Sequence, residues 1–464
     1  MRYNQQEEAM VRQLRWVLAL TMIMVTAAVI AACGGSDSSS TTAATATPTT
    51  GDATTSTEPV KLVMWWWGDQ EAAGLQAYVD ESAKLYNTEH PNVTIETVLQ
   101  STENLVPSFT AAAQAKEGPD IQYFWGGIYS MEPYWAGSIT PIEDLLGKDE
   151  VSHFVNASEV TSDGKVITAG WYAQPSFPML VRTDVLKANG IDQTPATWDE
   201  LMSACQTLSA AGVIPIAGGI KDGWFGGWLY SILGSQTATA DDVKAAVVGE
   251  QSFTDATQSE WWSKLQESVQ KKCWNNDVGS VDLYQGQALW SAGKAAMTIT
   301  AGTDARKFIK EVGADKVEVM AMPAYGDGPG AGKLGSTSQT LGVTSFSKHQ
   351  QEAADFIKFL HSPERLQAMY MASGAFPADD RFDPSIIDEA QMQKLWEMTK
   401  DGSPYLENFI PSELDVKAIF TQTQLIFSGE TDPTKAAEML QKTAERIRTT
   451  NPDLIDNYKR WTGQ

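Results

Sequence analysis

Apolar residues are most concentrated at positions 60–67, where β-branched, aliphatic and aromatic side chains are interrupted only by Lys61. Such a run is typical of a strand buried on both faces, as in a parallel sheet covered by helices. The run ends at Gly68-Asp69, and apolar residues then recur every three to four positions over residues 75–86, which predicts a helix. Strand, glycine turn and helix in this order are the opening of an α/β sheet.

The same pattern then repeats along the chain. Residues 93–98 alternate as a second strand, apolar positions within 105–113 predict a second helix, and residues 121–125 predict a third, short strand. This β-α-β-α-β order implies parallel strands joined by right-handed crossovers.

Three side chains follow the carboxyl ends of these predicted strands. Trp67 and Asp69 come after the first strand, and Trp125 ends the third. Ligands of open α/β sheets bind beyond the carboxyl ends of the strands. We therefore expect these side chains at the lip of one cleft, although the tryptophans also suit a core.

Length and charge narrow the choice of architecture and partner. A chain of 464 residues is too long for one small core, so two or more lobes are expected. The net charge of −24 repels phosphate backbones and argues against nucleic acid as a partner. Sixteen tryptophans require either a large core or a ligand surface that uses them.

The first 32 residues predict a secretory signal peptide. Arg12 and Arg15 precede an apolar run over 16–30, and small residues lead to Cys33. This ending resembles the lipobox of bacterial lipoproteins, which implies cleavage before Cys33, a lipid on its sulfur and an extracytoplasmic protein anchored to a bacterial membrane. An ordinary signal peptide with a chance cysteine is the alternative. Residues 33–58, rich in Ser, Thr and Ala, predict a flexible tether.

Several short motifs occur in a characteristic order over residues 60–450. Together they resemble the extracellular solute-binding proteins of ABC importers, in the carbohydrate-binding branch of the maltose-binding protein family. One departure is Val181-Arg182, where many members carry Tyr-Asn before the second motif. The motifs are Gly118-Pro119-Asp120, Pro195-x-Thr197-Trp198-Asp199-Glu200-Leu201, Gly293-Lys294-Ala295-Ala296-Met297, Met322-Pro323, Ala353-Ala354-x-Phe356-Ile357-x-Phe359-Leu360 and Gly374-x-Phe376-Pro377.

The resemblance implies an α/β, two-lobed periplasmic-binding-protein fold. Each lobe is expected to be a mainly parallel sheet flanked by helices, with a hinge of several segments between the lobes. Ligand would bind between the lobes, and hinge closure would bury it. The expected amino-terminal lobe comprises 59–173 and 323–360, the carboxyl-terminal lobe 176–318 and 364–464, and the crossings lie near 173–176, 319–323 and 360–364.

The implied ligand is a sugar or oligosaccharide, which presents flat C–H patches and a rim of hydroxyls. Aromatic rings match the patches, while carboxylates and amides pair with the hydroxyls. Ordinary packing is the alternative for each ring, and Trp198, Trp261, Trp262 and Trp290 are expected in the core. The candidate ligand-binding residues are Trp67, Asp69, Trp125, Trp171, Tyr172, Trp224, Trp228, Thr303, Asp304 and Phe376.

Cys205 and Cys273 lie in surroundings that resemble those of family members in which the two cysteines pair. We therefore expect a disulfide, because the compartment outside the cytoplasm permits oxidation. Two buried thiols are the alternative.

The chain contains no motif that marks a metal site, a cofactor or a catalytic centre. The four histidines are scattered, and the glycine-rich stretch 326–333 lacks the spacing of a phosphate-binding loop. We expect a monomeric, non-enzymatic protein whose partners are a carbohydrate, the transmembrane subunits of an ABC permease and, through Cys33, a membrane. A secreted glycoside hydrolase remains the alternative. A peptide or polyamine binder of similar fold would favour more carboxylates and fewer stacked rings in the cleft.

Overall fold

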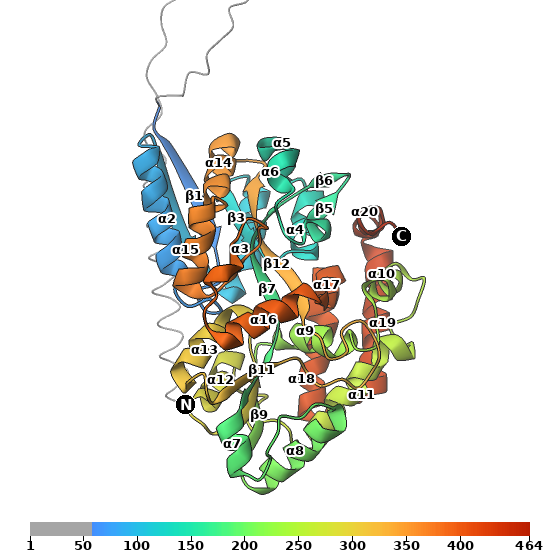
Figure 1. Cartoon of the computed structure of the whole chain (residues 1–464). Coiled ribbons are helices and arrows are strands. Elements are labelled where there is room, and N and C mark those ends of the chain that lie inside the picture. The colour runs from blue at the N-terminus through green and yellow to red at the C-terminus, as the bar shows by residue number, and fades with distance from the viewer. Residues whose placement is uncertain (1–57) are drawn as a thin grey trace, which may run out of the picture. The chain divides into compact units, whose positions relative to one another are not determined.

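The computed structural model describes residues 58–464 of the chain (Figure 1). The predicted signal peptide, the lipid attachment at Cys33 and nearly all of the predicted tether lie outside these residues. The described part contains two large sheets, each covered by helices, and we call each sheet with its helices a lobe. The two-lobed α/β fold expected from the sequence is confirmed.

The first sheet is built around β1 (Val60–Trp66), which pairs in parallel with β2 (Val93–Leu99) and β3 (Ile121–Phe124), as predicted. One face of β1 is fully buried and the other is half-buried or exposed, so β1 is less enclosed than expected. The strand order is β13-β7-β12-β3-β1-β2, and β4 and β14 pair with β12. The other strands are β4 (Ile139–Thr140), β7 (Ala169–Ser176), β12 (Gly335–Thr344), β13 (Phe376–Pro377) and β14 (Ser403–Pro404), while β5 (Thr161–Ser162) and β6 (Lys165–Val166) form a separate ribbon.

The second sheet has the order β11-β8-β10-β9, from β8 (Met179–Arg182), β9 (Ile214–Ala217), β10 (Ala295–Ile299) and β11 (Val317–Met320). Both sheets are mixed, which corrects the prediction of mainly parallel sheets. β12 runs antiparallel to β3 and β7, and β8 runs antiparallel to β10 and β11. These are the strands that flank the crossings between the sheets, and they enter each sheet against the direction of its β-α-β units.

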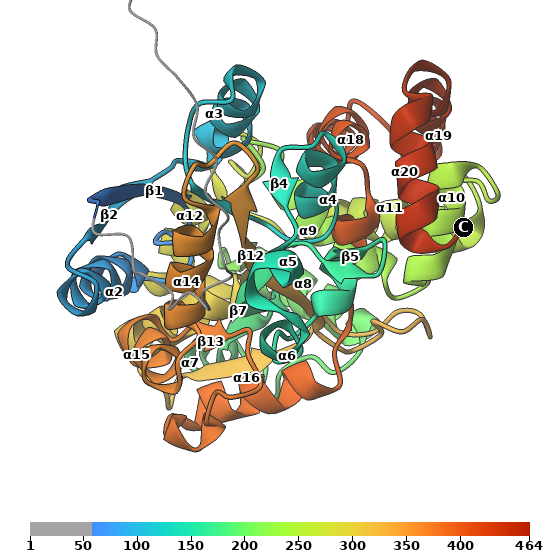
Figure 2. The same ribbon diagram turned by 90° about the horizontal axis from the view of Figure 1, so that it is seen from above.

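Helices cover both sheets. In the first lobe α2, α14 and α15 pack side by side, and in the second lobe α11, α18 and α19 form a second group (Figures 1 and 2). First-lobe helices are α2 (Leu75–Glu89), α3 (Thr102–Ala115), α4 (Ile128–Trp135), α5 (Ile142–Leu146), α6 (Lys148–Val151), α14 (Gln350–Leu360) and α15 (Pro363–Ser373). The remaining α-helices are α7 (Thr183–Ala188), α8 (Trp198–Ala210), α9 (Phe225–Leu229), α10 (Ala240–Val248), α11 (Ala256–Gln270), α12 (Leu283–Ser291), α13 (Ala305–Val312), α16 (Ala390–Lys400), α17 (Ser412–Leu414), α18 (Thr421–Ser428), α19 (Pro433–Thr450) and α20 (Pro452–Thr462).

The chain crosses between the sheets at Phe177-Pro178, after β7, and again between β11 and β12. These crossings lie close to two of the expected ones. The third expected crossing, near 360–364, differs, because α15 packs on α2 and both β13 and β14 pair within the first sheet. Part of the segment 364–464 therefore belongs with the first sheet, and the exact lobe boundaries stay a proposal.

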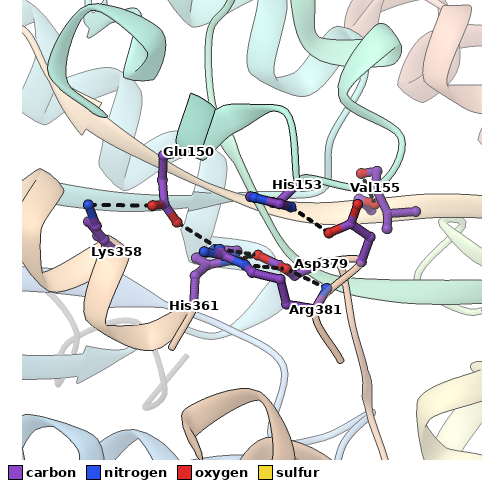
Figure 3. A network of polar contacts seen from close by, with 9 residues as sticks. Glu150, His153, Val155, Lys358, His361, Asp379 and Arg381 are labelled. Atoms are coloured by element: carbon purple, nitrogen blue, oxygen red, sulfur yellow. Dashed lines mark hydrogen bonds and ion pairs between the residues drawn. The ribbon is translucent and has the colours of Figure 1, made fainter. Parts of the chain in front are cut away.

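A buried ion-pair network holds the segment that follows β13 against the first lobe (Figure 3). Asp379 accepts hydrogen bonds from His361 Nδ1 at 2.9 Å and Arg381 Nε at 2.8 Å, and Arg381 Nη2 also contacts Glu150 Oε1 at 2.7 Å. The Arg381 and His361 partners hold the pKa of Asp379 well below its usual range despite burial.

In the second lobe a disulfide links Cys205 in α8 to Cys273 after α11, 68 residues apart. The predicted pairing is thus present in the structure, and both cysteines are fully buried. A capping box begins α8, because Thr197 Oγ1 accepts from Glu200 N and Glu200 Oε2 accepts from Thr197 N.

Replacing both Cys205 and Cys273 with Ala is expected to lower the free energy of unfolding by about 3–5 kcal/mol, because the unfolded chain regains the entropy of a long loop. Urea unfolding of the two proteins measures the difference. Thiol titration of the denatured, unreduced wild type is the control, and free thiols at both positions would contradict the disulfide.

Candidate ligand-binding site

A cavity of about 440 Å³ lies between elements of the two lobes. From the first lobe it is lined by Trp67 directly after β1, Trp125 directly after β3, and residues of α3, α4, β7 and β12. From the second lobe come Trp224, residues of α9 and α12, and the segment 405–420. The cavity therefore lies at the carboxyl ends of β1 and β3, where ligands of α/β sheets bind.

The first-lobe wall consists of three aromatic rings in edge-to-face contact. The ring centroids of Trp67 and Trp125 are 5.8 Å apart, and those of Trp125 and Tyr129 are 5.6 Å apart. Trp67 Nε1 donates to Thr102 Oγ1 at 3.0 Å, which fixes the indole against the start of α3. Trp67 is almost fully buried, whereas Trp125 and Tyr129 are half-buried and present more surface to the cavity.

The second-lobe wall is a continuous aromatic array. Phe177 stacks on Trp228 at 3.7 Å, Trp224 meets Trp228 edge-on at 5.2 Å, and Tyr284 lies 5.8 Å from Trp224. Trp224 and Trp228 were both candidates, and both line the cavity. Because Phe177 covers one face of Trp228 and Trp224 is only half-buried, Trp224 offers the more accessible ring.

Two buried carboxyl groups face this cavity. Glu71 accepts hydrogen bonds from Gln174 Nε2 at 3.1 Å and from Tyr284 OH, on the other lobe, at 3.5 Å. Burial raises the pKa of Glu71 to about 8, with smaller contributions from the charges of Asp304 and Glu407. Glu407 accepts from Tyr405 OH, and burial raises its pKa to about 7.

The position of Glu407 depends on a glycine in α9. A β-carbon at Gly227 would lie 2.2 Å from Glu407 Oε1, closer than any real contact permits. The absence of a side chain at Gly227 therefore lets the carboxyl approach the helix backbone.

Six predicted contact residues lie outside the cavity lining. Trp171 and Tyr172 are in β7 with their rings in the core, where Tyr172 OH lies 3.3 Å from Tyr123 OH. Asp69 accepts a hydrogen bond from Gln76 N at 2.9 Å and so holds the first turn of α2.

The other three residues are also buried in the body of the protein. Thr303 and Asp304 form part of a short 3-10 turn, with Asp304 Oδ1 at 3.5 Å from Lys307 Nζ. Phe376 is in β13, where pairing with β7 places its ring parallel to that of Tyr370 at 5.9 Å. Except for the buried Thr303, each of these side chains has a packing, capping or ion-pair partner.

Sequence reasoning missed much of the polar lining. Glu71 follows the same strand end as Trp67 and Asp69, so its position after β1 was a usable signal. Phe177 is at a crossing, and Tyr405 and Glu407 are in a segment without regular periodicity, so no local pattern marked them. The remaining polar lining residues include Thr102, Gln174, Thr337, Gln339 and Asn408.

Neither a metal cluster nor a membrane span is found within residues 58–464. No group of three or more His, Cys, Asp or Glu side chains in this range is placed to hold a metal ion. None of its helices combines the length and the apolar character needed to cross a bilayer.

Comparison with known proteins agrees with this geometry. A family model described as bacterial extracellular solute-binding protein matches residues 67–365. An uncharacterized ABC transporter extracellular-binding protein of Pyrococcus horikoshii is 24% identical over 412 residues, covering 84% of this chain and 88% of that protein.

Solved structures share the fold. A chitin oligosaccharide binding protein superposes with a TM-score of 0.77 at 22% identity, covering 84% of this chain and 99% of its own. Maltose-bound MalE3 of T. maritima superposes with a TM-score of 0.67 at 17% identity, covering 84% and 100%. Two lobes around a central cavity define the class of solute-binding proteins. This chain belongs to the family of bacterial extracellular solute-binding proteins.

The raised pKa of Glu71 predicts how stability depends on pH. The native state keeps a proton on Glu71 between about pH 4.5 and pH 8, whereas the unfolded chain releases it. The native state thus binds more protons, so the free energy of unfolding falls as pH rises through this window. In Glu71→Gln this fall is expected to be shallower by up to about 1.4 kcal/mol per pH unit.

Urea unfolding between pH 5 and pH 8 measures both slopes. Glu397→Gln, at an exposed helical position, is the matched control and is expected to keep the wild-type slope. Identical slopes for the wild type and Glu71→Gln would show that this carboxyl is already ionised in the native protein.

Proposed function

We propose that this protein is the substrate-binding subunit of an ABC importer and captures a sugar or oligosaccharide between its lobes. The observation that carries the proposal is the pair of aromatic walls, one from each lobe, that line one cavity. Rings on both sides match the flat C–H faces of a sugar, and the amide, hydroxyl and carboxyl groups between them match its hydroxyls. The structural relatives support the proposal, since one is a chitin oligosaccharide binding protein and another holds maltose.

Ligand binding would favour the arrangement in which both walls touch the ligand, and that arrangement would present both lobes to a permease. The two lobes already meet at the cavity, because Tyr284 of the second lobe donates a hydrogen bond to Glu71 of the first. The protein acts as a monomer and without turnover. Through a lipid on Cys33, the body would be held at the outer face of a bacterial membrane by the tether.

Binding is tested by calorimetry with a panel of mono- to tetrasaccharides. Trp224→Ala and Trp125→Ala are each expected to weaken binding of the best ligand about tenfold or more, equivalent to roughly 1.4 kcal/mol. Trp461→Ala, a half-buried tryptophan outside the cavity, is the control and is expected to bind normally. Cleavage of the oligosaccharides would instead support the glycoside hydrolase.

The anchor is tested separately by mass spectrometry of protein isolated from membranes. The mature chain is expected to begin at a lipid-modified Cys33, and Cys33→Ser is expected to lose both the modification and membrane retention. A mature amino terminus elsewhere, without lipid, would contradict the anchor while leaving ligand binding untouched.

A further inference from the structure

All of the charged side chains that line the cavity are acidic. They are Glu71, Glu103, Asp222 and Glu407, and the lining contains no Lys, Arg or His from the described part of the chain. None of the four carboxylates is ion-paired with a basic side chain within residues 58–464, although 22 such pairs of 4.0 Å or less occur there. The cavity therefore gathers acidic side chains without a basic partner.

Glu71 and Glu407 are also deeply buried, with 6% and 8% of their surfaces exposed. The titratable groups around Glu71 include Tyr123, Tyr172, Tyr284, Asp304 and Glu407, and those around Glu407 include Tyr129, Tyr230, Tyr405 and Asp415. Lys307, the basic partner of Asp304, is not part of the lining. No basic group among these neighbours stabilises an ionised carboxylate, so a cation brought by the ligand would do so.

The rings favour a cation as well. Trp67, Trp125, Trp224 and Trp228 line the same cavity as the carboxyl groups, and indole faces attract cations through their quadrupole. Carboxyl groups alone would suit a polyamine, and rings alone would suit a neutral sugar. Their combination matches a ring-shaped, hydroxylated molecule that carries positive charge.

We propose that the captured carbohydrate bears a basic nitrogen, as in an amino sugar or an oligosaccharide of amino sugars, and that its ammonium group pairs with Glu71. This inference rests on the proposed sugar-binding function. In the complex Glu71 is ionised, its pKa lowered by the ammonium group. An acidic sugar is rejected, because its carboxylate would meet only acidic side chains and no basic one in the lining.

The test compares matched sugars by calorimetry on the wild-type protein. The probes are glucosamine, glucose and glucuronic acid; galactosamine and galactose; and β-1,4-linked di- to tetramers of glucosamine, N-acetylglucosamine and glucose. An amine-bearing probe is expected to bind at least about tenfold more tightly than its neutral counterpart, and the preference is expected to shrink with added salt.

Glu71→Gln keeps the size of the side chain and removes its charge. It is expected to reduce the preference for the amine, measured as the ratio of the two Kd values, about tenfold, and Glu397→Gln, outside the cavity, is the control. If a neutral sugar from any panel binds as well as or better than every amine-bearing probe, the inference is overturned and the proposed function stands. If no carbohydrate binds at all, the proposed function itself fails.

Discussion

The stacking of Phe177 on Trp228 is the contact on which the cavity depends. β7 ends at Ser176, so Phe177 lies where the chain leaves the first sheet for the second. Its φ of 57° is a backbone conformation that bulky residues rarely adopt, and it is retained while the ring packs on Trp228 at 3.7 Å and against Tyr405 at 5.4 Å. Phe177 therefore belongs both to the crossing between the lobes and to the aromatic wall. A change in lobe orientation at this crossing also moves the wall.

The polar side of the cavity is likewise held by more than one segment. Glu71 receives hydrogen bonds from β7 and from Tyr284 of α12, which belong to different lobes. Asn408 Nδ2 donates to Thr337 Oγ1 of β12, while the backbone N of Glu407 donates to Ser231 Oγ. Because these groups join segments that lie far apart in the chain, the arrangement of the polar lining and the relative placement of the lobes are energetically linked.

The features that a short stretch of sequence determines, such as the ends of strands, could be predicted from the sequence. Trp67 and Trp125 were expected at one cleft because a strand end is readable from an apolar run, and both line the cavity; their contact with a ligand stays a prediction. Trp171 lies within β7, and its direction is set by a strand pairing that no short window contains. The same holds for β12, whose antiparallel partners lie more than 150 residues away and make the sheet mixed. Glu407 was missed because its segment has neither helical nor strand periodicity.

The close approach of Glu407 to Gly227 restricts which substitutions the two positions can accept. A side chain at position 227 would occupy the space of the carboxyl, and a shorter residue at position 407 would leave the helix backbone facing an unfilled gap. Position 227 is therefore not free to gain a side chain while Glu407 is present. In relatives, a side chain at position 227 is therefore expected only where position 407 carries a residue smaller than Glu.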